Sequence, residues 1–190
     1  TLNAVTAQSI YERNYQFAKP PAKPHVTAAP GDEKVTLYWN DIAEYSIDPI
    51  SEKNDFEGYV IYRSTDPQFL DQQTITDAYG SHFLFTPLEM AGGAPAKFDL
   101  VNDYSGLSNI PYTGHGIPYN LGNNTGIRHS LVDSNNVING QVYYYAVASY
   151  DHGDDSLQIA PAECSKQITL NPESNEIFMD INTAQIIPRA

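Results

Sequence analysis

Alternating apolar and polar positions recur along the chain and predict strands rather than helices. The densest run spans 143–150, where aromatic, β-branched and small residues follow one another without proline or charge. Tyr143 and Tyr145 point to one face of such a strand, and Tyr144 and Ala146 point to the other. Because both faces are apolar, this strand is expected in the middle of a sheet that is covered on both sides.

Shorter segments with the same alternation predict the rest of an all-β sandwich. Strands are expected at 25–30, 35–39, 56–63, 127–132 and 162–170. Within the second of these, Val35, Leu37 and Trp39 share one face, as the core side of a two-layered fold requires. The last, which places Cys164 and Ile168 on one face, is expected to close the sandwich.

Proline and glycine divide the chain into segments. Residues 1–18 are expected to form a short helix or a linker, and the proline-rich stretch 19–24 a stiff, extended connector. The sandwich then covers 25–170, with a large insertion at about 64–128 between its third and later strands. The apolar content of this insertion predicts an ordered subdomain rather than a disordered loop. Residues 171–190 are expected to form a tail that leads to a next module.

The strand pattern carries the marks of a known family. Trp39 lies on the second strand, Gly-Tyr-Val-Ile-Tyr-Arg (58–63) forms most of the third, and Val137 stands six residues before Tyr143. In these parts the chain resembles a fibronectin type III domain, which is an immunoglobulin-like β-sandwich. The resemblance implies that the Tyr143 hydroxyl bonds back to the preceding backbone, as in the tyrosine corner of that family.

Four stretches also resemble a recurring segment of very large bacterial surface proteins, which the type IX system often exports. These stretches are 15–21, 30–39, 56–67 and 139–145. The resemblance implies an extracellular or cell-surface location and a non-catalytic structural or adhesion role, as a spacer or assembly unit. The implied partners are other modules of the same polypeptide or other surface proteins.

The charge of the chain narrows the range of partners. Asp and Glu number 23 against 10 Lys and Arg, which gives a net charge of −13. A field of this sign repels nucleic acid and anionic membranes and attracts divalent cations. No apolar run is long enough to span a bilayer, so membrane insertion is not expected.

Two acidic loops form the first candidate site. One joins the second and third strands and the other follows the strand at 143–150, so both are expected at the same end of the sandwich. Carboxylates gathered from two loops suit Ca²⁺, which binds six to eight oxygens in a flexible geometry. The candidate calcium ligands are Asp41, Asp48, Asp55, Asp151, Asp154 and Asp155. The alternative is a solvated acidic rim that keeps the protein soluble.

Tyrosines of the insertion form the second candidate site. Tyr79, Tyr104, Tyr112 and Tyr119 could line a cleft for a carbohydrate or a protein, because tyrosine combines an apolar ring with a polar tip. The competing expectation is that the insertion covers an apolar outer face formed by the strands at 56–63 and 143–150.

Motifs for catalysis are missing from the sequence. The chain has no Gly-x-Ser-x-Gly elbow, no P-loop and no dinucleotide fingerprint, and its five histidines lack ligand spacing. Its one cysteine, Cys164, rules out an intrachain disulfide and is expected to be a buried, inert thiol. The sequence therefore predicts a protein that is not an enzyme and that binds no cofactor other than calcium.

Overall fold

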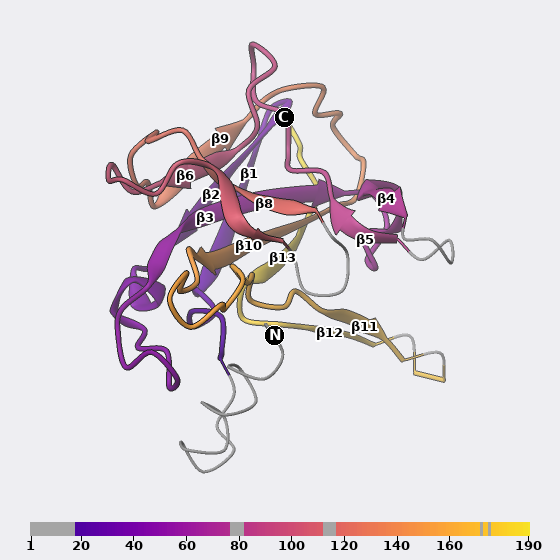
Figure 1. The fold of residues 1–190 in the computed structure, drawn as a ribbon. Coiled ribbons are helices and arrows are strands. Elements are labelled where there is room, and N and C mark those ends of the chain that lie inside the picture. Colours follow the sequence, from indigo (N-terminus) through magenta and orange to yellow (C-terminus); the bar gives the residue numbers. More distant parts are fainter. Residues whose placement is uncertain (1–17, 77–81, 112–116, 172, 175) are drawn as a thin grey trace.

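The computed structural model describes residues 18–76, 82–111, 117–171, 173–174 and 176–190, and within these ranges the protein is all-β. The helix expected near the amino terminus lies outside the described residues. Two antiparallel sheets form the body of the molecule (Figure 1). The first has the order β1 (Val26–Gly31), β2 (Lys34–Trp39), β9 (Ser130–Asp133). The second has the order β13 (Thr183–Ile186), β10 (Tyr143–Asp151), β3 (Phe56–Ser64), β6 (Lys97–Asp99).

The main core lies between these two sheets. Val35, Leu37 and Trp39 of β2 are buried against Tyr59 of β3 and Val147 of β10. The Trp39 ring meets the Tyr59 ring edge-on at 5.9 Å between centroids. Strand alternation alone places these side chains on one face, and the predicted core face is confirmed.

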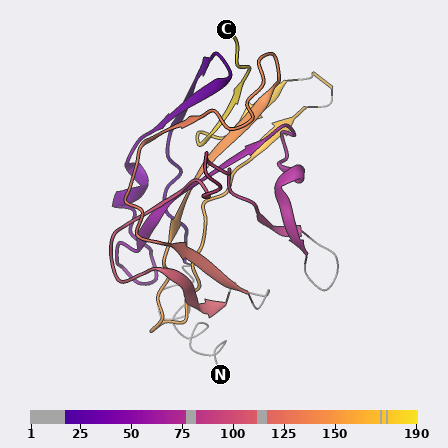
Figure 2. The ribbon, with the colours of Figure 1, turned by 90° about the horizontal axis from the view of Figure 1, so that it is seen from above.

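A second core covers the opposite face of the larger sheet. Tyr62 of β3 and Ala146 of β10 pack there against Phe69, Tyr119 and Leu121, which belong to the insertion. The insertion therefore covers the apolar outer face, as expected. Figure 2 shows the hairpins β4–β5 (Gln73–Thr76 and His82–Phe85) and β7–β8 (Gly106–Pro111 and Pro118–Gly122) on the side of β3 and β10 that faces away from β1 and β2.

The insertion is divided in two by a strand of the main sheet. β6 pairs with β3 through Gly58 and Asp99, so the segment 64–128 is not a single subdomain. Before β6 lie η2 (Leu70–Gln72), β4 (Gln73–Thr76) and β5 (His82–Phe85). After it lie β7 (Gly106–Pro111) and β8 (Pro118–Gly122). A further 3-10 turn, η1 (Ile42–Tyr45), follows β2.

The strand that closes the larger sheet differs from the one predicted. Residues 162–164 begin it as expected, because the Cys164 amide donates to Ser149 O at 2.9 Å. The chain then leaves the sheet as β11 (Ile168–Leu170), which pairs with β12 (Ile177–Met179). It returns as β13, which pairs with Tyr143–Ala146 of β10. The prediction that one continuous strand at 162–170 closes the sandwich is therefore wrong, because a hairpin interrupts that strand and the sheet continues beyond residue 170.

The two described ends of the chain are attached to opposite ends of the sandwich. At the start of β1, the proline-rich connector is docked rather than free: the Lys19 amide donates to Asp48 Oδ2 and the Ala22 amide to Ser46 Oγ, both at 2.8 Å. At the other end, the Gly140 amide donates to Pro188 O at 2.9 Å, and the Arg189 amide to Gly31 O at 3.2 Å.

Candidate functional site

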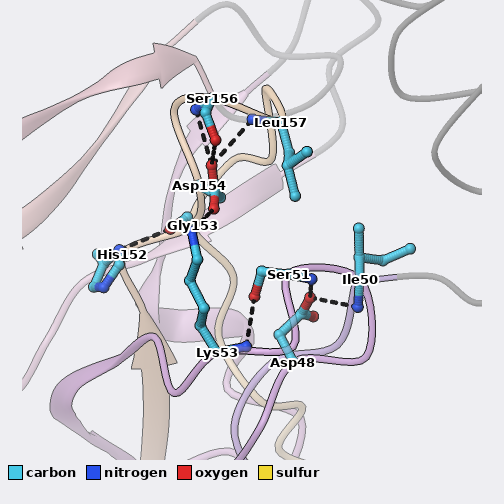
Figure 3. Close-up of polar contacts among 9 residues, drawn as sticks. All are labelled: Asp48, Ile50, Ser51, Lys53, His152, Gly153, Asp154, Ser156 and Leu157. Carbon is cyan, nitrogen blue, oxygen red and sulfur yellow. Dashed lines mark hydrogen bonds and ion pairs between the residues drawn. The ribbon is translucent and has the colours of Figure 1, made fainter.

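The two acidic loops lie side by side at the end of the sandwich where the connector enters. The His152 amide, after β10, donates to the Asp55 carbonyl, before β3, at 3.0 Å. Lys53 of the first loop reaches Asp154 of the second, with 3.0 Å between Nζ and Oδ2. Figure 3 shows both loops with these side chains. The topology expected from the sequence therefore brings the two loops into contact.

Asp48 organises the first loop by accepting hydrogen bonds from the backbone. Its Oδ1 accepts from the amides of Ile50 and Ser51, each at 2.8 Å, in the turn that aspartate favours (Figure 3). Its Oδ2 accepts from the Lys19 amide of the connector. Only 3% of Asp48 is exposed, so this buried carboxylate joins the loop and the connector through three backbone N–H groups.

Asp154 organises the second loop in the same way. Its Oδ1 accepts from the amides of Ser156 and Leu157 at 2.9 and 3.0 Å (Figure 3). Burial alone would raise the pKa of Asp154, but hydrogen bonds from Ser156 and Lys53 outweigh it and lower that pKa to about 2. Asp154 is thus an ionised, fully engaged loop clamp.

In the acidic loops, Asp55 and Asp151 are carboxyl groups that the fold holds at an electrostatic cost. Burial, with the charge of Asp48 as the next cause, raises the pKa of Asp55 to about 6. Burial and the charge of Asp55 raise the pKa of Asp151 to about 8, although Asp151 Oδ1 accepts from the amides of Gly153 and Ala162. Three buried carboxyl groups from two loops therefore act on one another.

The remaining two candidate ligands lie at the periphery and have other partners. Asp41 precedes η1 and accepts a hydrogen bond from the Tyr45 hydroxyl at 3.2 Å. Asp155 is exposed and accepts from Asn109 Nδ2 at 2.7 Å. Neither of these contacts directs the carboxylate toward Asp55 and Asp151.

As arranged, Asp48 and Asp154 hold loop backbone, and Asp41 and Asp155 have other side-chain partners. The oxygens of Asp48 and Asp154 already accept from N–H groups, so a cation could bind them only through their remaining lone pairs. Within the described ranges, no three acidic, histidine or cysteine side chains are grouped as metal ligands. Calcium therefore stays a prediction from the sequence.

The tyrosine site is divided by the structure. Tyr104 is 45% exposed and stacks face to face on His152, with 3.7 Å between ring centroids and 5° between planes. Tyr119 is buried in the second core and donates to Glu163 at 2.6 Å, so the expectation that it lines an open cleft is wrong. Tyr79 and Tyr112 lie outside the described residues.

The sequence analysis missed Glu57, which is fully buried in β3. At the β3–β10 pairing, Tyr150 lies opposite Gly58 and Asp151 opposite Phe56, so Glu57 is the extra residue of a β-bulge. Its Oε2 accepts from Asn102 Nδ2 at 2.9 Å, and its buried Oε1 has no hydrogen-bond partner among the described residues. Burial raises the pKa of Glu57 to about 7. A charged residue beside glycine in an otherwise apolar strand was the signal that could have identified it.

A second missed group is a polar cluster inside the second core. Glu163 accepts from the hydroxyls of Tyr62 and Tyr119, and Lys97 Nζ lies 4.3 and 4.2 Å from the ring centroids of Tyr119 and Tyr150. Burial lowers the pKa of Lys97 to about 8. Hydrogen bonds and ring contacts thus compensate charges that an apolar core would otherwise exclude.

No helix of the described residues is long and apolar enough to cross a membrane. Comparison of the chain with protein-family models, with curated protein sequences and with solved structures returned no match.

Proposed function

We propose that this chain is a non-catalytic structural module of a secreted cell-surface protein, with a sandwich of the fibronectin type III kind, and that it acts as a spacer or assembly unit. The observation that carries the proposal is the attachment of the connector and of residues 188–189 at opposite ends of the sandwich. A module whose chain enters at one end and leaves at the other extends a polypeptide along its own long axis.

Three further features support the proposal. The sheets contain three and four strands in the orders given above. The Tyr143 hydroxyl accepts from the Ile138 amide at 3.0 Å, which is the bond that a tyrosine corner requires. The docked connector, whose Pro21 and Pro24 are buried, suits a spacer because it limits bending at the junction.

The polar groups support a structural rather than a catalytic role. Asp48 and Asp154 hold loop backbone, and Glu163 is bonded to two tyrosine hydroxyls inside the second core. A catalytic group must be able to reach a substrate, and these side chains are engaged in holding the fold.

The proposed location is tested by adding protease to intact source cells. A surface module is cleaved without lysis, and an antibody to this chain then loses its signal while a cytoplasmic marker stays intact. A chain that remains protected until the cells are lysed would contradict the proposal.

The calcium prediction is tested separately by thermal melts. A cation that binds only the folded state stabilises it by about 2.7 kcal/mol when present at about 100 times its dissociation constant, and this raises the midpoint of the melt. A rise with CaCl₂ that excess EDTA reverses, and that Asp55→Asn removes, would support calcium at the acidic loops. Equal midpoints with CaCl₂ and with excess EDTA would contradict calcium binding at the acidic loops.

A further inference from the structure

We propose that the exposed Tyr104 ring, stacked on His152 and flanked by acidic residues, is a docking platform for an arginine-bearing basic peptide segment of a partner protein. The inference does not depend on the proposed spacer role, since it concerns one surface of the chain and is tested on the purified protein.

The Tyr104 ring is held in place although it is exposed. One face of the ring contacts the imidazole of His152, so the exposed part of the ring lies on its other face and edges. The Tyr104 amide donates to Asn102 Oδ1 at 2.7 Å, and Asn102 Nδ2 donates to the buried Glu57. An exposed ring that is anchored through a buried carboxyl group loses little conformational entropy when a partner binds.

The His152 imidazole under the Tyr104 ring is also held in place. The His152 amide donates to Asp55 O, and His152 Nδ1 donates to Gly153 O at 2.7 Å. Burial lowers the pKa of His152, which keeps the imidazole neutral at neutral pH. A neutral aromatic pair, unlike a protonated one, does not repel a cation from the outer ring face.

Negative charge surrounds the Tyr104–His152 platform. Asp154 and Asp155 both act electrostatically on His152, and the exposed Asp103 precedes Tyr104 in the chain. Lys53 is the basic group that acts on His152, and its Nζ is paired with Asp154. Asp155 accepts only from the neutral Asn109 amide and keeps its negative charge near His152, and Asp103 adds a second exposed charge next to Tyr104 in the chain.

The free face of the Tyr104 ring suits a cation, and arginine in particular. Elsewhere this chain places its own cations on aromatic rings, as with Lys166 Nζ at 3.5 Å from the Phe85 ring centroid and Arg128 Cζ at 5.1 Å from that of Phe98. Over the part of the chain that the structure describes, Tyr104 receives no such cation. Arginine fits the platform best, because its planar guanidinium stacks on a ring while it donates to a carboxylate.

The test measures binding of a fluorescent hexa-arginine peptide to the 190-residue chain by anisotropy. An exposed cation–π contact contributes about 0.5–1 kcal/mol, so Tyr104→Ala should weaken binding by about twofold to fivefold, and Tyr104→Phe should restore it. Tyr38→Ala is the matched control, because Tyr38 is 51% exposed on the outer face of β2 and neither substitution changes the net charge. Asp155→Asn should weaken binding more than Asp32→Asn, which removes an equal charge at the far end of the sandwich.

Equal affinities for the Tyr104→Ala and Tyr38→Ala proteins would overturn the proposal, because the peptide would then be attracted only by the overall negative charge. Cellohexaose serves as a neutral probe of the same ring. If Tyr104→Ala abolished cellohexaose binding and left hexa-arginine binding unchanged, the platform would be a glycan site and the basic partner would be wrong.

Discussion

At the scale of single residues, Gly58 shows how closely the layers approach. A Cβ at this position would overlap Phe98 O and would lie 2.8 Å from the Tyr150 hydroxyl. The same hydroxyl donates to Leu121 O of the insertion. Glycine is required here because β3, β6 and the second core meet where Glu57 forms the bulge.

Gly58→Ala is therefore expected to destabilise the protein strongly, by about 1–3 kcal/mol or more, since backbone oxygen cannot move aside as a flexible side chain can. Gly31→Ala is the control, because its new Cβ would meet only the flexible side chain of Lys34. Urea unfolding of both variants measures the difference. Equal midpoints for the two would show that β6 can shift away from β3 without cost.

At the scale of elements, the interrupted closing strand depends on Asn182. This residue is fully buried where the chain returns from β12 to β13. Its Nδ2 donates to Val147 O of β10 and to Ser165 O, both at 3.1 Å. The backbone carbonyl of Asn182 accepts from the Val147 amide at 3.0 Å. Asn182 thus joins the two halves of the strand across the gap that the β11–β12 hairpin leaves.

Asn182→Ala should destabilise the protein by about 1–3 kcal/mol, because the carbonyl of the buried Val147 and the carbonyl of Ser165 lose their shared donor. Hydrogen exchange at the β13 amides should accelerate more than exchange at the β2 amides, which lie in the other sheet. Asn135→Ala is the control, since Asn135 Nδ2 donates to Glu89 O in an exposed place. Uniform acceleration in both sheets would argue against a local role.

At the scale of the whole molecule, buried carboxyl groups make stability depend on pH. Asp55, Glu57 and Asp151 have pKa values raised to about 6, 7 and 8, with burial as the largest cause in each. In the unfolded chain such groups lose their protons near pH 4, as carboxyl groups in water do. Between these limits the folded state binds more protons than the unfolded state.

The free energy of unfolding should therefore fall as the pH rises from about 5 to about 7.5. His152 and, toward the upper end of this range, Lys97 oppose the trend, because burial lowers the pKa of each, but the three carboxyl groups act across the whole range. The asparagine of Asp151→Asn cannot ionise, so this substitution should raise the free energy of unfolding at the higher pH and make it vary less with pH. Asp32→Asn, at an exposed position, should have neither effect. Urea unfolding across this range measures the effect, and stability that increases with pH would contradict it.

How far the sequence could predict the candidate site is clear from the acidic loops. Their common end of the sandwich follows from strand order, and the contact between His152 and Asp55 agrees with it. Which oxygens would be engaged could not be read in advance, because the partners of Asp48 include Lys19, far away in the chain. Tyr104 and Tyr119 looked equivalent in sequence, and only the packing of β8 on β10 buried one of them.

The sequence by itself determined the strand faces, because alternation is a local property that every strand imposes on its own side chains. It also determined that the larger sheet needed a cover, since both faces of β10 are apolar. Only the tertiary structure decided that 183–186 rather than 165–170 completes the closing strand, and that Glu57 and Asp151 are buried with raised pKa values. Pairing across many residues and the field at a carboxyl group depend on neighbours brought together in space, which no local pattern contains.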